Sequence, residues 1–358
     1  MNSVKKSSLL DQAVREAIQS IAVGPDRGRD ISAELAEQIM TGILDGLADP
    51  VQAAVFLIAL RMKRESIDEF TGLLSALDKS THKLQVNVKT LVCLADPFDG
   101  YVRSATMTPF IAPVLAACGL HVLIHGVESV GPKHGVTAHK VYAAHGIKAL
   151  YDQQLAKNNI ETYGWAYLDQ SSYNAKLYGL QGLRDKIIKR SALTTLDRIL
   201  CPLRAQDTTA LALAYVHKAY PSIYAELAKQ VGYQQVLLFK GVEGGLAPAL
   251  NKPIRRYFCD SPETFASLEK QILELDLTLQ AQRAAVDLAD FKNPVEETLA
   301  VGLKVLKGSK DIARKSLTLA AANILYSFSP EHSFNRCVEK VERSLDNGSA
   351  LATFDALR

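Results

Sequence analysis

The stretch LADPFDGYVRSATMTPF, residues 94–110, carries acids and hydroxyls between an apolar strand-like run and a helix-like one. Junctions of this kind bind phosphate in many proteins, because consecutive backbone N–H groups point at the anion and glycines let it come close. Here Gly100 is the only glycine, and two acids, Asp96 and Asp99, repel negative charge. Whether this loop still holds a phosphate is therefore the first question that the sequence raises.

Length and composition give the chain room for a large core. Its 358 residues are 48% apolar, enough for one large or two medium domains. The five cysteines lie far apart without paired metal-ligand spacing, which is typical of buried thiols in a reducing compartment. Charged residues interrupt the N-terminal run before it reaches the length of a signal peptide, and no stretch approaches a membrane span. We therefore expect a cytoplasmic protein with no membrane partner.

The N-terminal region, residues 1–83, is expected to be helical. Apolar residues recur at helical spacing, and Asp49 with Pro50 supplies a cap and a first-turn proline. Ser66 and Glu69 have the spacing of a capping box that begins the next helix. These signals predict a small all-α domain.

After residue 83, short strands alternate with helices. This alternation predicts an α/β fold with a mainly parallel sheet flanked by helices, beside the separate small all-α domain. From Glu263 onward the pattern returns to helices. The expected strands are TLVCLA, HVLIHG, ETYGWAYL, QVLLFKG and RRYFC, and the expected helices lie near 109–118, 137–145, 208–230, 312–328 and 334–357.

Several motifs resemble the anthranilate phosphoribosyltransferase family, the glycosyltransferase group that also contains pyrimidine nucleoside phosphorylases. The similarity begins in DISAELAEQIMTGILDGLADPVQAAVFLIALRMKRESIDEFTGLL and continues in the same order through CGLHVLIHG, TTLDRILCPL, QVLLFKGVEGG, LKVLKGSKDIARKSLTLAAANILY and SLDNGSALATFDAL. The resemblance implies a helical domain at 1–83, completed by about 174–197, and an α/β domain with C-terminal helices at 84–358. It also implies a substrate cleft between them and a homodimer that pairs through the N-terminal helical domain.

The resemblance locates a site for phosphoribosyl pyrophosphate, but the residues there depart from the family. The family's GTGGDG loop becomes ADPFDG at 95–100, which keeps only Asp99 and Gly100. The asparagine-x-serine-threonine stretch becomes TMTP, where Thr106 and Thr108 keep hydroxyls and the amide is lost. Both changes remove groups that would approach a pyrophosphate.

Two further elements of the family site differ. The lysine-histidine-glycine-asparagine stretch becomes IHGV, with Ile124 in place of the cation, and the magnesium-holding aspartate-glutamate pair becomes Leu246 and Ala247. Four losses in one site indicate that phosphoribosyl transfer is lost. We therefore expect no catalytic residue, no metal and no cofactor, with magnesium bound only if transfer survives. The degenerate donor site comprises Asp99, Gly100, Thr106, Thr108, His125 and Gly126.

The non-glycine loop and the IHG strand end also resemble a divergent branch of the family, the YbiB-type proteins, which is associated with nucleic-acid binding rather than tryptophan synthesis. Positive charge is clustered: 182–204 has six cations and two acids, and 304–315 has five cations and one acid, in a chain of net charge +3. The expected nucleic-acid-binding residues are Arg184, Lys186, Lys189, Arg190, Arg198, Arg204, Lys252, Arg255, Arg256, Lys310, Arg314 and Lys315.

A helix over residues 182–198 would place Lys186 and either Lys189 or Arg190 on one face, and a dimer would repeat that stripe. Contacts from such a stripe to phosphates give salt-sensitive binding of DNA or RNA without sequence specificity. A basic run is, however, often only a solvated helix face. Arg184 and Arg190 also fall on family positions and could be structural remnants.

Other side chains also allow two interpretations. Tyr167, Tyr173 and Tyr178 could stack on unpaired bases, or they could lie in the core with wet hydroxyls. His125 and His134 could act as bases, but histidines without a carboxylate partner are more often structural.

A metal site formed by other acidic residues is a further alternative. Asp99, Glu128 and Glu243 could bind a cation if their loops converge, although solvation at the surface is the simpler role for them.

Three functions follow from these patterns. The first is a non-catalytic homologue that binds DNA or RNA non-specifically through basic clusters on a homodimer. The alternative is a phosphoribosyltransferase of the anthranilate phosphoribosyltransferase type with an altered substrate. The third is a protein-interaction scaffold that uses the helical dimer face.

Overall fold

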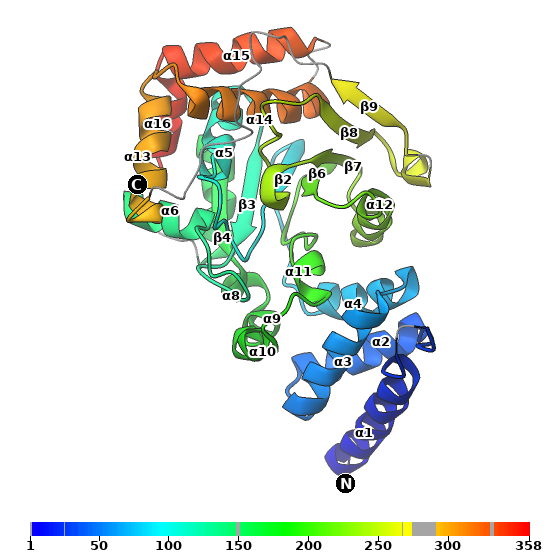
Figure 1. Cartoon of the computed structure of the whole chain (residues 1–358). Helices are drawn as coiled ribbons and strands as arrows, with labels where there is room; N and C mark the ends of the chain where they lie inside the picture. Colours follow the sequence, from blue (N-terminus) through cyan, green and yellow to red (C-terminus); the bar gives the residue numbers. More distant parts are fainter. Residues whose placement is uncertain (1, 25, 148–150, 267, 274–290, 330–332) are drawn as a thin grey trace.

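The computed structural model describes residues 2–24, 26–147, 151–266, 268–273, 291–329 and 333–358 (Figure 1). Its N-terminal helices form a separate unit, drawn in blue. The predicted caps are confirmed: Asp49 caps the third helix, and Ser66 and Glu69 form the capping box of the fourth. The helices are α1 (Asn2–Ile21), α2 (Ala33–Leu44), α3 (Pro50–Lys63) and α4 (Ile67–Lys79).

A seven-stranded sheet forms the centre of the second unit, in the order β4-β3-β2-β6-β7-β8-β9. The first five strands of this order pair in parallel, and β8 and β9 are antiparallel. The predicted mainly parallel sheet is therefore confirmed. The strands are β2 (Thr90–Ala95), β3 (Val122–Gly126), β4 (Trp165–Asp169), β6 (Thr208–Tyr215), β7 (Gln235–Lys240), β8 (Ile254–Cys259) and β9 (Lys270–Leu273), and a separate parallel pair joins β1 (Leu84–Gln85) to β5 (Leu203–Arg204).

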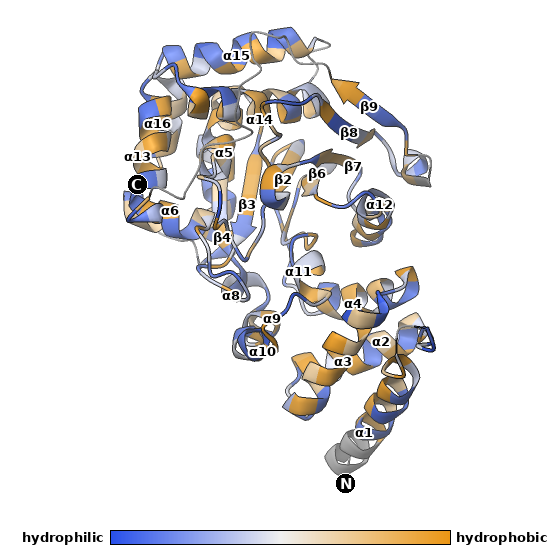
Figure 2. Ribbon diagram, in the orientation of Figure 1, coloured by the Kyte–Doolittle hydropathy of each residue, from blue (hydrophilic) through white to orange (hydrophobic). Residues whose placement is uncertain are grey.

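Different helices cover the two faces of this sheet. Along β2, Cys93 and Ala95 belong to an apolar core shared with α12 and the N-terminal helices, whereas Val92 and Leu94 belong to a core shared with α5 and α14. A strand buried on both faces needs apolar residues at consecutive positions, and β3 is accordingly hydrophobic over most of its length in Figure 2. The covering helices include α5 (Thr108–Ala117), α6 (Ala138–His145), α7 (Gln153–Tyr163), α12 (Tyr220–Val231), α13 (Pro294–Leu306), α14 (Ile312–Phe328), α15 (Phe334–Asp346) and α16 (Ser349–Asp355).

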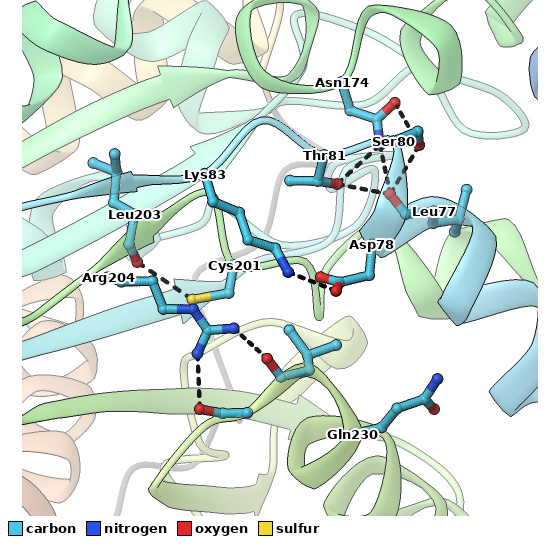
Figure 3. Close-up of polar contacts among 12 residues, drawn as sticks. Leu77, Asp78, Ser80, Thr81, Lys83, Asn174, Cys201, Leu203, Arg204 and Gln230 are labelled. Atoms are coloured by element: carbon cyan, nitrogen blue, oxygen red, sulfur yellow. Dashed lines mark hydrogen bonds and ion pairs between the residues drawn. The ribbon is translucent and has the colours of Figure 1, made fainter.

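A chain of short helices leads from β4 back to the N-terminal unit. Asn174 anchors this segment, because its Nδ2 donates to Leu77 O, Ser80 Oγ and Thr81 Oγ1, each at 3.0 Å (Figure 3). These contacts fix the end of α4 against the segment that follows the sheet. The short helices are α8 (Gln170–Tyr173), α9 (Ala175–Tyr178), α10 (Gln181–Ile187) and α11 (Leu193–Leu196). The division of the chain at residue 83 stays a prediction.

One of the expected helices is wrong. Residues 208–230 contain the strand β6 before α12, because the buried run TTALALAY has no alternation and its periodicity does not separate a buried strand from a helix. The single helix considered over 182–198 does not form: the segment has two helices, α10 and α11, separated by Ile188 in a left-handed conformation at φ 62°. Lys186 and Lys189 therefore do not share one helix face.

Smaller differences concern the strand boundaries. The residues ETY of the expected strand ETYGWAYL end α7, and β9 lies in the region expected to be helical after Glu263. All five cysteines are buried, as expected. Within the described part of the chain, no helix combines the length and apolarity needed to cross a bilayer.

Candidate functional site

A cleft lies between the carboxyl ends of the parallel strands and the N-terminal helical unit. It encloses about 130 Å³ and receives residues from the loops after β2, β6 and β7. The carboxyl ends of parallel strands meet at one edge, which is where open α/β sheets bind ligands. Arg61 of α3 and Arg198 complete the lining from the other unit and from the segment after α11. The fold thus brings both units to one site.

Asp99 lies in this cleft with its charge already compensated. Arg190 donates to Asp99 Oδ2 from Nε at 3.0 Å and from Nη2 at 2.7 Å, and Lys133 Nζ is 3.8 Å from Oδ1. The side chain of Asp99 is only 1% exposed. Gly100 has φ 72°, and a Cβ there would lie 2.7 Å from the backbone of Gly135, so the glycine serves the local backbone packing.

Tyr101 fills the inside of the loop. Its hydroxyl donates to Asp96 Oδ1 at 2.5 Å and lies 3.1 Å from Thr108 Oγ1. A Cβ on Gly245 would overlap that hydroxyl, so the neighbouring loop closes tightly over it. Burial raises the pKa of Asp96 to about 6, against the opposing hydrogen bond from Tyr101. Thr106 Oγ1 accepts the N–H of Thr108 at the start of α5.

The carboxylate of Glu243 accepts hydrogen bonds from the backbone N–H groups that follow Tyr101. The N–H groups of Arg103 and Ser104 donate to its Oε1 at 3.0 and 2.8 Å, and Val102 donates to Oε2 at 3.4 Å. Lys133 Nζ lies 3.5 Å from the same carboxylate. Sequence reasoning missed Tyr101 and Lys133, because neither stands in a recognised motif.

His125 is a buried structural histidine. Its Nδ1 pairs with the hydroxyl of Tyr173 at 2.8 Å, and burial lowers its pKa to about 3. A neutral ring at this position favours the structural interpretation. Gly126 lies against Tyr167, and the exposed His134 pairs with Asp185 at 3.2 Å.

The residues present do not fit the family's magnesium ion. Leu246 is fully buried, and Ala247 has no oxygen in its side chain. The alternative site of Asp99, Glu128 and Glu243 is wrong, since the described residues hold no group of three or more metal-ligating side chains. Asp99 and Glu243 are engaged with cations and backbone donors instead.

Three of the expected nucleic-acid-binding arginines are held by groups around the cleft and the sheet. Arg184 pairs with buried Asp197 at 2.9 Å, and Arg198 donates to the carbonyl of Ala214 at 2.9 Å. Arg204 donates to the carbonyl of Gly232 at 2.7 Å (Figure 3). These hydrogen bonds engage the three side chains within the chain, and Arg184 and Arg198 are also buried, so they offer little surface to a phosphate.

Two more of these arginines are buried beside α14. Arg256 donates to Asn323 Oδ1 at 3.0 Å and is 1% exposed. Arg314 pairs with Asp346 at 2.8 Å and is 6% exposed. The expectation that both arginines lie at the surface is wrong, because the fold buries them.

The remaining expected cations do not form one cluster. Lys315 is half-buried, and the others are exposed. Lys189 and Arg190 line a surface hollow of about 650 Å³ next to α3, together with Arg61. No acid lines this hollow within the described residues. Among the expected residues, the exposed cations outside its lining are Lys186, Lys252, Arg255 and Lys310.

Sequence reasoning also missed Arg61, although it lies in the basic last turn of α3, in the run RMKR. The stacking hypothesis is wrong for Tyr167 and Tyr173, which are each 1% exposed. Tyr178 is half-buried and packs against a small apolar cluster with Phe98.

Comparisons with known proteins agree with this architecture. Residues 15–81 match the helical bundle domain of a glycosyl transferase family, and residues 100–351 match its a/b domain. An uncharacterized protein of Aquifex aeolicus is 24% identical over 89% of this chain and 94% of its own length. The anthranilate phosphoribosyltransferase of Methylocella silvestris is 25% identical over 92% and 91%.

Solved structures show the same fold. Anthranilate phosphoribosyltransferase from Thermus thermophilus has a TM-score of 0.71 and 18% identity, covering 96% of this chain and 98% of that one. The Saccharomyces cerevisiae enzyme, solved in complex with PRPP and Mg, has a TM-score of 0.74 and 14% identity, covering 96% of each chain. The chain therefore belongs to this glycosyltransferase family and has the anthranilate phosphoribosyltransferase-like fold.

Proposed function

We propose that this chain has lost phosphoribosyl transfer and binds DNA or RNA without sequence specificity. The observation that carries the proposal is the surface hollow beside α3, where Arg61 and Lys189 meet Arg190, which also pairs with buried Asp99; no acid stands in the described lining itself. Such a surface attracts phosphates through charge alone. Met62 and Ile188 also line it and are 73% and 69% exposed, so apolar surface lies beside the cations.

The adjoining cleft supports the loss of transfer. Its lining includes Glu65, Asp99 and Glu243 besides Arg61, Arg190 and Arg198, and Arg190 is already paired with Asp99, so the cleft offers a pyrophosphate little uncompensated positive charge. Tyr101 fills the loop interior, and Leu246 stands where the family holds a metal-binding acid. A polyanion is therefore directed to the hollow rather than into the cleft.

A homodimer would place two such hollows on one particle. The first half of α3, outside the lining of the hollow, exposes Val51 and Val55, 71% and 42% exposed, and Figure 2 colours much of this helix hydrophobic. A second copy of the chain covering only this part of the helix would remove that surface from water. Two hollows on one particle would raise affinity through simultaneous contacts to one strand.

The test measures binding of single-stranded and double-stranded DNA and of RNA at several salt concentrations. The variant replaces Arg61 and Lys189 by alanine and keeps Arg190, because Arg190 neutralises buried Asp99. The matched control replaces two exposed lysines elsewhere by alanine, namely Lys89 and Lys229. We expect weaker binding and a smaller salt dependence in the first variant only. No binding by the wild-type protein at low salt would refute the proposal.

A second candidate is a phosphoribosyltransferase with an altered substrate. Relatives named anthranilate phosphoribosyltransferase cover more than nine-tenths of both chains, and the cleft between the two units is present. Titration calorimetry with phosphoribosyl pyrophosphate and Mg²⁺ tests it. A heat of binding that disappears when a chelator removes Mg²⁺ would favour a phosphoribosyltransferase over a non-catalytic homologue. A scaffold function would instead predict a protein partner that is recovered equally after nuclease treatment.

A further inference from the structure

The loop after β2 already binds one anionic group, the carboxylate of a glutamate from the same chain. Three consecutive N–H groups, those of residues 102–104, converge on the carboxylate of Glu243 at 3.4, 3.0 and 2.8 Å. Consecutive backbone donors that point into one concavity are a common way to bind phosphate. The carboxylate lies where such a ligand would lie.

Lys133 completes the surroundings of this carboxylate. Its Nζ is 3.5 Å from Oε2 of Glu243 and also donates to the carbonyl of Gly100 at 2.9 Å, which holds the ammonium in place. The side chains of Lys133 and Glu243 are only 16% and 11% exposed. Four donors therefore surround one partly desolvated anion, which strengthens each contact.

We propose that the N–H groups of residues 102–104 and Lys133 form a binding site for one phosphoryl group, which Glu243 occupies as a built-in competitor. A phosphate monoester has more acceptor oxygens and more negative charge than a carboxylate, so it competes well for the same four donors. Glu243 and Gly244 also line the cleft, so a ligand that enters the cleft reaches the site directly. Withdrawal of the Glu243 side chain exposes all four donors together.

This site differs from the loop at 95–100. There, the N–H of Gly100 donates to the carbonyl of Pro97, and Asp99 is paired with Arg190, so both groups are already engaged. The inference also stands apart from nucleic-acid binding at the hollow, since its ligand is a single terminal phosphoryl group. Failure of either proposal therefore leaves the other testable.

The experiment titrates inorganic phosphate into wild-type protein, Glu243→Ala and Glu243→Gln, and follows the amide signals of residues 102–104 by NMR. We expect Glu243→Ala to bind phosphate about tenfold or more tightly than the wild type, with a smaller gain for Glu243→Gln, whose amide still fills the site. Parallel titrations with ribose 5-phosphate and a nucleoside monophosphate distinguish free phosphate from phosphate esters as the ligand.

Two controls make the result specific. Lys133→Met in the Glu243→Ala background should remove most of the gain. Glu297→Ala provides a matched loss of charge, because Glu297 also accepts two backbone N–H groups, at 2.7 and 2.8 Å. This variant should bind phosphate as the wild type does. Folded Glu243 variants with wild-type phosphate affinity, or a gain that persists without Lys133, would overturn the proposal.

Discussion

The buried carboxylate of Asp96 gives the loop after β2 a measurable dependence on pH. Burial raises its pKa from 3.8 to about 6, and the hydroxyl of Tyr101 and the charge of Arg198 oppose the rise. Between about pH 4 and pH 6 the native state keeps the proton while the unfolded state loses it, so the free energy of unfolding falls as pH rises. A rise of roughly two pKa units corresponds to about 3 kcal/mol.

Asp96→Asn removes this titration while keeping an oxygen that accepts from Tyr101. Urea unfolding of both proteins, measured from about pH 4 to pH 7, should show the variant gaining about 3 kcal/mol relative to the wild type over that range. Tyr101→Phe removes the donor that lowers the Asp96 pKa. The pH range over which the free energy of unfolding falls should therefore move to higher pH. The reasoning would be refuted if the difference in the free energy of unfolding between wild type and Asp96→Asn stayed constant across this pH range, or changed in the opposite direction.

Three further outcomes are expected. Arg184→Ala leaves buried Asp197 without its ion partner and should lower the free energy of unfolding by about 3–5 kcal/mol in urea, whereas a loss below about 1 kcal/mol would contradict the buried pair. Gly245→Ala forces a Cβ against Tyr101 and should cost about 1–3 kcal/mol in thermal unfolding, and an unchanged midpoint would show that the loop relaxes freely. Val51→Glu places a charge on the exposed apolar start of α3 and should shift the proposed dimer to monomer in sedimentation; an unchanged sedimentation profile would show that this face is not the interface.

Much of the fold could be predicted from local sequence. The run TLVCLA is the strand β2 from Thr90 to Ala95, and the capping box at Ser66 and Glu69 begins α4, because both signals depend on residues close together in the chain. The loss of the family's metal-binding acids at Leu246 was equally visible, since a side chain without oxygen ligates no magnesium wherever it lies.

The candidate site required the tertiary structure. Tyr101 meets Asp96 inside the loop, and Glu243 reaches the N–H groups of Arg103 and Ser104 across about 140 residues of chain. Neither contact has a sequence signature. The carboxylates of Asp96 and Asp99 are paired with Tyr101 and Arg190, and the N–H groups of residues 102–104 donate to Glu243. Arg190 and Glu243 are far from the loop in the sequence, so only the tertiary structure shows that these groups are engaged.

The salt dependence of nucleic-acid binding shows how many of the cations in the sequence contact phosphates at the protein surface. Each contact between a cation and a single strand contributes roughly 0.7 to the magnitude of the negative slope of log affinity against log salt. The twelve expected residues would give a magnitude of about 8 per protomer and about 17 in a dimer, whereas Arg61, Lys189 and Arg190 give at most about 2 per protomer and about 4 in a dimer. A magnitude of about 8 per protomer would mean that buried side chains such as Arg184 and Arg256 become exposed on binding, at the cost of their internal ion pairs and hydrogen bonds. A magnitude of about 8 for a whole dimer needs only exposed cations, because six of the expected residues in each protomer are exposed. A magnitude near 2 or 4 agrees with binding at the hollow alone, and a slope of zero would exclude phosphates as the contacted groups.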